Sequence, residues 1–277
     1  MLYAPATTED SPQEDLTDSR RRLFEISDAC IRFIRETSQR AAMFHIDVDD
    51  LAEQAKLQTR LDAWCHRLDE LLHRMQATGN PAKQDALNLL LVHYKVTYIW
   101  MRVCTTAGEM ATDSYHSDFE DLVHYAEQIV KPAVGMATPQ LLSFDMQILG
   151  PLYYTALKCR HPAIRRRALE MLQLAPRREG VWNAHYAYVT AKRVIELEER
   201  HFNGQEFPDE TLRVHGLPLP DDESRIYSPG EMSFRFRKFN HSIVASPAYP
   251  GMLRAVFRTK PWGLLGRWQT ITEYIKL

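Results

Sequence analysis

The stretch that most constrains the fold is residues 148–199, because its prolines and glycine cut it into short helical segments. Apolar residues follow a helical spacing through the first segment. Pro162 suits the first turn of a second helix, where no backbone N–H is needed. Pro176 ends that helix, and Gly180 allows a tight reversal before Trp182 opens a third. The sequence therefore predicts three consecutive helices in this stretch.

The second of these helices carries an arginine-rich run. Ile164, Ala168 and Leu172 repeat at helical spacing and predict its inward face. Arg165 and Arg166 fall beside that face, so we expect both to point toward solvent or a partner. Replacing the two arginines by alanine should then cost no more than about 1 kcal/mol, because exposed ion pairs contribute little.

The two flanking helices carry further expectations. In the first, Pro151 is expected to kink or split the helix. The third is expected to end in a polar, acidic run over 196–200. Its apolar face is predicted to consist of Trp182, Tyr186, Val189, Val194 and Leu197.

Helical periodicity also covers most of the chain before this stretch. One helix is expected from about residue 19, a second up to about residue 75, a third over about 83–110 and a fourth over about 117–132. The second of these contains a heptad pattern, spaced 4-3-4-3-4, at Leu57, Leu61, Trp64, Leu68, Leu71 and Met75. Both a coiled-coil dimer seam and an antiparallel hairpin with the preceding helix satisfy this pattern. Because it lasts for under three heptads, we favour the hairpin.

The pattern changes near the C-terminus. Prolines and glycines over 203–230 exclude long helices, and short alternating runs predict strands at 212–214, 232–237, 252–257 and 268–277. The fold class is therefore expected to be mainly α, a layered antiparallel helical array with a small C-terminal antiparallel β-sheet. We expect no strand inside 50–200 and no helix through 231–238.

The expected organisation has three parts. Residues 1–18 are predicted to be a disordered tail, 19–202 a helical body, and 203–277 a β-containing subdomain packed on that body. No secretory signal or membrane span is recognisable, and the four cysteines form no C-x-x-C pair. A soluble, intracellular chain with free thiols is the expectation.

One candidate metal site arises from spacing. His66, Glu70 and His73 stand at i, i+4 and i+7 and share one helix face. They lie opposite the heptad residues, on the side that faces water, so we favour a solvated face over a metal centre. No cofactor is expected either.

The densest basic cluster is a candidate interaction site for phosphate or an acidic partner. It consists of Arg160, Arg165, Arg166, Arg167, Arg177 and Arg178, and the last five of these are the predicted interaction residues. The alternative is a solvated helix face partly paired with nearby acids such as Glu170, Glu179 and 196–199. With a net charge of -2, the chain offers no bulk attraction to nucleic acid.

Aromatic residues suggest a further possibility. Tyr153, Tyr154, Trp182 and Tyr186, together with Met146, are placed either in the core or around an apolar ligand cavity. The sequence contains no phosphate loop, no H-E-x-x-H and no G-x-S-x-G motif. An enzyme is therefore not expected.

The run from Leu149 to Ala184 resembles the hallmark segment of the C-terminal regulatory domain of fungal binuclear zinc-cluster transcription factors. In that family, Lys-Cys-Arg ends a helix, and an arginine-rich helix and Pro-Arg-Arg-Glu-Gly follow before a Trp. Matching residues here are Lys158, Cys159, Arg160, Pro162, Arg165–Arg167, Pro176–Gly180 and Trp182.

The resemblance implies a regulatory or effector domain that acts in the nucleus through protein partners of the transcription machinery, a homodimer, or an apolar effector. Such factors often govern secondary-metabolite genes. The family's six-cysteine DNA-reading cluster has no counterpart in this sequence, so we expect no direct DNA binding. The alternative is a cytoplasmic interaction or scaffold protein derived from the same family.

Overall fold

The computed structural model describes residues 15–75, 81–133, 142–143, 148–175, 178–180, 182–200, 219–229, 244–245 and 250–277. Its helices are α1 (Leu16–Ala42), α2 (Val48–Met75), α3 (Pro81–Val103), α4 (His116–Ala133), α5 (Leu149–Lys158), α6 (Pro162–Leu174) and α7 (Ala184–Glu199). The strands are β1 (Leu142–Ser143), β2 (Arg178–Glu179), β3 (Trp182–Asn183), β4 (Ile226–Pro229), β5 (Val244–Ala245), β6 (Met252–Thr259) and β7 (Gln269–Lys276). The predicted fold class is confirmed.

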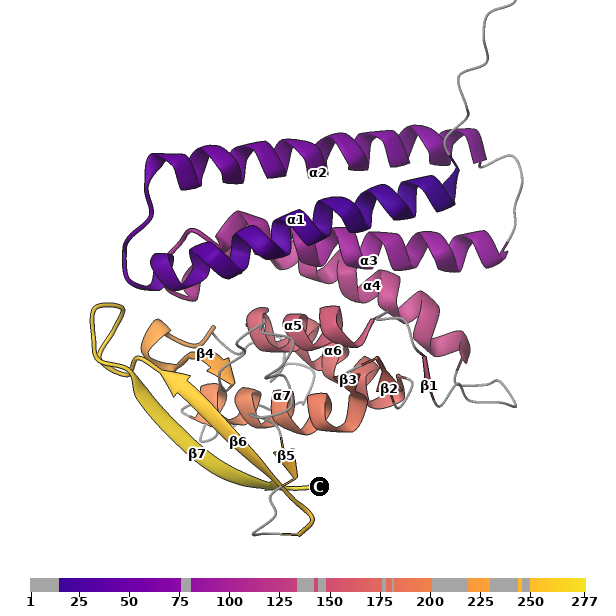
Figure 1. The fold of residues 1–277 in the computed structure, drawn as a ribbon. Helices are drawn as coiled ribbons and strands as arrows, with labels where there is room; N and C mark the ends of the chain where they lie inside the picture. Colours follow the sequence, from indigo (N-terminus) through magenta and orange to yellow (C-terminus); the bar gives the residue numbers. More distant parts are fainter. Residues whose placement is uncertain are drawn as a thin grey trace, which may run out of the picture.

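Helices α1, α2 and α3 form one layer, and α4 connects it to a second layer of α5, α6 and α7 (Figure 1). In the first layer the heptad leucines of α2 and Trp64 are buried against α1 and α3. The indole of Trp64 also donates a 2.8 Å hydrogen bond to the carbonyl of Ser19. The predicted hairpin is therefore confirmed. These heptad residues are buried by helices of the same chain and are not available as the seam of a dimer.

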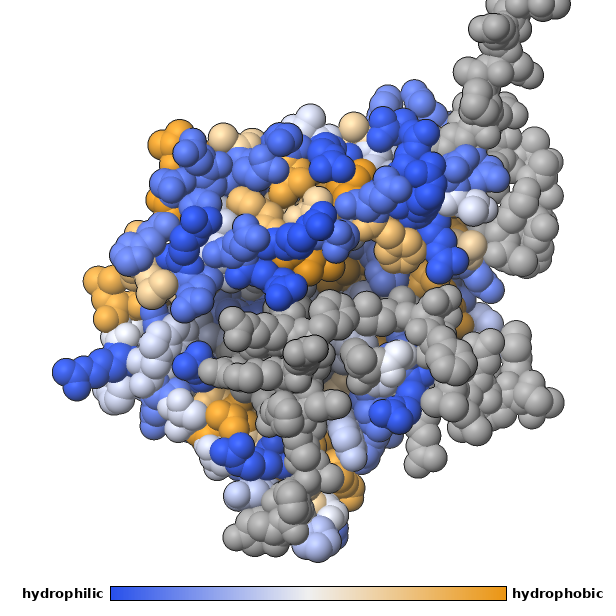
Figure 2. All heavy atoms as spheres, viewed as in Figure 1, coloured by the Kyte–Doolittle hydropathy of each residue, from blue (hydrophilic) through white to orange (hydrophobic). Residues whose placement is uncertain are grey.

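The outward side of this first layer is polar. Figure 2 shows hydrophilic side chains over most of the surface of α1 and α2, with apolar side chains visible between the two helices. This division follows from sequence, since α1 turns Leu23, Cys30 and Ile34 inward at helical spacing.

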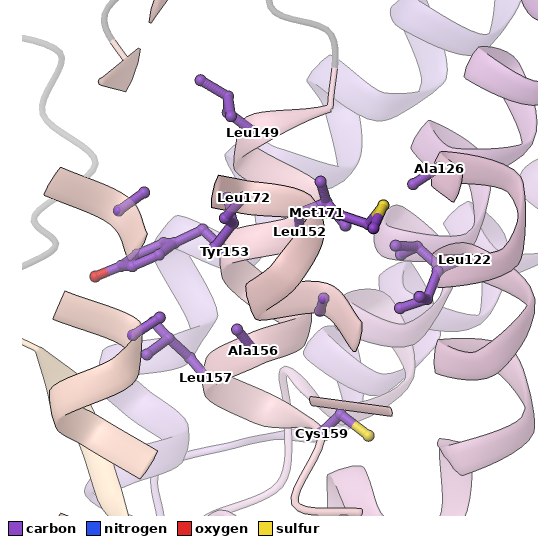
Figure 3. Packing of buried hydrophobic residues seen from close by; sticks show 14 of the residues in the cluster. Leu122, Ala126, Leu149, Leu152, Tyr153, Ala156, Leu157, Cys159, Met171 and Leu172 are labelled. Atoms are coloured by element: carbon purple, nitrogen blue, oxygen red, sulfur yellow. The ribbon is translucent and has the colours of Figure 1, made fainter. Parts of the chain in front are cut away.

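Helix α5 is the centre of the second layer. Figure 3 shows its side chains, among them Leu152, Tyr153 and Leu157, directed toward several neighbouring helices. The helix begins at Leu149, so Pro151 lies in its first turn, where a missing N–H does no harm. The expected kink or split at Pro151 is therefore wrong.

Three two-residue strands lie inside 50–200, where the sequence predicted none. Strands β2 and β3 pair antiparallel around Gly180, which has a φ of 53°, and β1 pairs parallel with β2. This pairing brings the buried Glu179 carboxylate to the start of α5, where it accepts the backbone N–H groups of Ile148 and Leu149 at 2.9 and 2.8 Å. A carboxylate is favourable at a helix N-terminus.

The C-terminal sheet is built on β6, which pairs along its length with β7 and at its two ends with β4 and β5, all antiparallel. The strands expected at 252–257 and 268–277 are confirmed as β6 and β7. Those expected at 212–214 and 232–237 lie outside the described residues, as does the expectation of no helix through 231–238. Strand β4 was not predicted, because Ser228 and Pro229 interrupt its apolar alternation.

The sheet shares its apolar core with the second helical layer. Ala255 and Phe257 of β6 are buried in the same cluster as the residues of α5 to α7. Arg193 of α7 also pairs with Glu273 of β7 through two hydrogen bonds of 2.6 and 2.9 Å. The sheet thereby forms one wall of the space between the layers.

Candidate functional site

Arg165, expected to face solvent, has no exposed side-chain surface. Its guanidinium donates to Glu198 at 2.7 Å, to Glu199 at 3.4 Å and to the carbonyl of Ala156 at 3.3 Å. The prediction was wrong because the last turn of α7 packs against α6 and presents carboxylates there. The acidic run that ends α7, expected to be the polar end of this helix, is buried at Glu198 and Glu199.

Arg160 extends this buried ionic network. It donates to Glu109 at 3.0 Å and to Glu198 at 3.1 Å, while Lys158 lies 2.5 Å from Glu109. Glu198 also accepts the backbone N–H of Ile226 at 2.8 Å. Burial alone would raise the pKa of Glu198, but Arg160, Arg165 and the Ile226 hydrogen bond hold this pKa below its ordinary value.

The network ties α5, α6, α7 and β4 together, so its arginines are primarily structural. Each carboxylate lies between two cations, and this arrangement offsets the cost of removing charges from water. The sequence signal for it was weak, since Arg160 and Glu198 stand 38 residues apart.

The other arginines of the predicted interaction set are distributed differently. Arg166 pairs with Glu199 of α7 and Arg167 with Glu127 of α4, and both side chains are one-third exposed. Arg178 is exposed, and Arg177 lies outside the described residues. Binding of an acidic partner by the accessible members stays a prediction.

The metal candidate on α2 is not assembled. His66 lies 3.5 Å from Glu70, whereas His73 contacts Asp69, and all four side chains are well exposed. No group of three or more potential metal ligands is found in the described part of the chain. All four cysteines are free, as expected.

A cavity of about 740 Å³ lies between the first layer on one side and α5 with the sheet on the other. Its lining is mainly apolar on the side of α1 and α3, where it includes Phe24, Ile31, Ile34, Val96, Trp100 and Val103. Tyr153, Tyr154 and Trp182 line it as the sequence suggested. Tyr186 is not among its described lining residues, and Met146 lies outside the described residues.

Aromatic rings form one wall of this cavity. Trp100 of α3 lies 5.4 Å from Tyr154 of α5, and Tyr153 lies 5.4 Å from Trp182, measured between ring centroids. Gly150 belongs to the same wall, because a Cβ there would meet the Trp182 ring at 3.4 Å. The wall can therefore stack against a flat apolar molecule.

The opposite end of the cavity carries charge. Lys158, Arg258 and Lys260 line it, together with Glu109, Tyr227 and Trp268. Burial lowers the pKa of the Lys158 ammonium, and the neighbouring Glu109 carboxylate offsets part of this effect. This end was not predicted from the sequence, because its residues come from α5, β4, β6, the β6–β7 turn and the segment between α3 and α4.

The cavity holds no activated nucleophile among its described cysteines. Burial raises the pKa of the Cys104 thiol to about 11, so the thiol stays protonated at neutral pH. The arrangement is suited to holding a molecule, with stacking surfaces on one side and cations on the other.

No protein-family model, curated protein or solved structure matches this chain. Among the described residues, no helix has the length and apolar character needed to cross a membrane. The fold and the cavity thus define a mainly helical protein with a cavity between its two layers.

Proposed function

We propose that the chain is a regulatory domain of the type found in fungal zinc-cluster transcription factors, and that it responds to a small apolar molecule bound between its layers. The observation that carries the proposal is the 740 Å³ cavity. Its size falls within the range of about 300–1,000 Å³ that ligand sites usually have. The segment around Lys158 and Trp182 resembles that family, and on this resemblance we propose that the chain acts in the nucleus.

The position of the cavity suggests how a ligand would act. Its walls come from both helical layers, so a bound molecule would favour the arrangement in which both contact it. Glu109 and Lys158 belong to the wall and also to the ionic network that reaches α7. Occupancy would thereby change the surface that α6 and α7 offer to protein partners.

A second candidate is a scaffold protein without an effector, acting in the cytoplasm. The observation favouring it is the apolar turn between β6 and β7, where Trp262 is 66% and Leu265 is 87% exposed. Exposed apolar side chains at such a tip suit contact with another protein. In this case the cavity would need no ligand for function.

Cavity binding can be tested with pyrenebutanol, a neutral fluorescent probe, titrated into the purified chain. Replacing Val96 by Trp fills the α3 side of the cavity and should abolish binding. The matched control is Val48→Trp, at a 79% exposed position outside the cavity, which should bind like the wild type. Equal binding by all three proteins would contradict the proposal, provided circular dichroism shows each to be folded.

The regulatory role needs a cellular readout. Fused to an unrelated DNA-binding domain, the chain should alter reporter transcription, and Val96→Trp should change that output while Val48→Trp should not. The chain alone should give no sequence-specific shift of duplex DNA at physiological salt, because its sequence has no counterpart of the family's six-cysteine cluster and its net charge is -2. Transcriptional output that neither variant alters would favour the scaffold alternative.

A further inference from the structure

Among the cations of the second layer and the sheet, two groups lie at or near the cavity. Those of the buried network are matched by carboxylates, as in the pairs Lys158–Glu109 and Arg165–Glu198. Lys260 and Arg258 differ, because neither pairs with a carboxylate anywhere in the described part of the chain. Both line the cavity.

Lys260 is held in place without an acid. It is only 4% exposed, and its ammonium donates a 2.7 Å hydrogen bond to the carbonyl of Leu264. The same nitrogen lies 4.6 Å from the centroid of the Trp268 ring and 5.8 Å from that of Tyr227. A buried ammonium is costly unless an anion or strong acceptors compensate it, so this end of the cavity favours negative charge.

Two acids near this end, Glu109 and Asp222, have other partners, although one carboxylate oxygen of Asp222 is buried without a hydrogen-bond partner among the described residues. Both oxygens of Glu109 are bound, one by Lys158 and the other by Arg160. Asp222 accepts a 2.9 Å hydrogen bond from the hydroxyl of Tyr227. Neither carboxylate forms a hydrogen bond or ion pair with Lys260 or Arg258.

We infer that the cavity takes an amphiphilic anion, a flat apolar body with one carboxylate or similar group. This inference rests on the proposed function of the cavity. The apolar body lies against the wall formed by Trp100 and Tyr154, and the anionic group reaches Lys260 and the exposed Arg258. The anion is then compensated by the buried Lys260 and the exposed Arg258, while the apolar part is buried against the aromatic wall.

The test compares three fluorescent probes that differ only in their head group: pyrenebutyrate, pyrenebutanol and pyrenebutylamine. The carboxylate should bind at least about tenfold more tightly than the alcohol, since a charge-assisted hydrogen bond contributes that much or more. The amine should bind most weakly. Raising the salt concentration should reduce the preference for the carboxylate.

Two variants locate the anion. Lys260→Met and Arg258→Met should each reduce the preference for carboxylate over alcohol, whereas Lys260→Arg should keep it. Arg254→Met is the matched control, because Arg254 lies on the same strand β6, is exposed like Arg258 and does not line the cavity. Lys260→Met could loosen the turn by removing the hydrogen bond to Leu264. In that case, Arg258→Met still measures the carboxylate preference at the same end of the cavity.

The outcomes separate the two proposals. If the alcohol binds as tightly as the carboxylate, or the amine binds best, the anion inference is wrong while the cavity remains a binding site. If the preference survives in both Met variants, the anion does not lie at Lys260 and Arg258, and the assignment fails. If none of the three probes binds, the proposed function of the cavity fails as well.

Discussion

The two helical layers bury their inward faces by different means. In the first layer, the α2 residues between α1 and α3 are mostly apolar, and Leu61 and Trp64 have no exposed surface, although Asp50 and Gln54 of α2 are also buried. In the second, equally buried positions between α5, α6 and α7 are held by Arg160, Arg165 and Glu198. The same helical spacing therefore supports a hydrophobic interface in one layer and an ionic one in the other.

This difference distinguishes the stability of a layer from the specificity of its packing arrangement. Apolar side chains gain from burial in almost any close-packed arrangement. A buried arginine is tolerated only where its carboxylates are placed correctly, as Glu198 and Glu199 are for Arg165. We expect the second layer to be more sensitive to loss of a single charge and to pH.

The largest effect is expected for Arg165→Met. Removing the guanidinium leaves Glu198 and Glu199 buried with less compensation, and breaking such a pair costs roughly 3–5 kcal/mol in unfolding free energy. Arg166→Met is the matched control, since its side chain is one-third exposed and its loss should cost far less. Urea unfolding measures the stability of both variants. Equal losses of unfolding free energy would show that the buried Arg165 contributes no more than the partly exposed Arg166.

Leu61→Ala tests the apolar layer. The side chain is fully buried, so its truncation should cost about 2–5 kcal/mol through lost burial and a residual cavity. No titratable partner is involved, and this cost should be the same at pH 7 and pH 4.5. A cost that falls in acid would show that the first layer depends on charges as the second does.

The pH dependence of the second layer follows from Glu198. Its pKa is lowered in the folded chain, so its ionised form stabilises the fold above about pH 4.3, the ordinary glutamate value, and this contribution is lost as the pH falls through the lower folded pKa. Glu198→Gln should cost roughly 1–3 kcal/mol at pH 7 and less in acid.

Glu196→Gln is the control for this titration, since Glu196 is on the same helix and its side chain is 45% exposed. Melting curves between pH 3 and pH 7 give the comparison. A Glu198→Gln cost that stays constant over that range would contradict the ionic account of the second layer.

The smallest effect is expected on the outward face of α2. Glu70→Gln should change the unfolding free energy by no more than about 0.5 kcal/mol, because the side chain is 59% exposed. Added zinc should leave the melting temperature of wild type and variant unchanged. A zinc-dependent rise that Glu70→Gln abolishes would restore the metal site suggested by the spacing of His66, Glu70 and His73.

The parts of the fold that follow from local pattern were predictable. The heptad of α2, Pro162 at the start of α6 and the alternation of β6 each reflect a period or a backbone rule. The two-residue strands inside 50–200 were not predictable in this way, since they depend on the turn at Gly180 and on pairing with a distant segment.

The charged residues of the site could not be predicted from the sequence, for a physical reason. An acidic run such as 196–199 is usually solvated, and only the packing of α7 on α6 buries Glu198 beside Arg165. The aromatic character of Tyr153, Tyr154 and Trp182 predicts core or cavity positions, but nothing local indicates that Lys260 lies at the same cavity.

The most direct test of the account maps where a ligand binds. A photoreactive diazirine analogue of pyrenebutyrate is cross-linked to the intact chain, and the labelled peptides are identified by mass spectrometry. Binding between the layers predicts adducts on α3 around Val96 and Trp100, on β6 around Arg258 and at Trp268 just before β7, all suppressed by excess pyrenebutyrate. Adducts confined to the exposed Trp262 and Leu265, or insensitive to competition, would contradict binding between the layers.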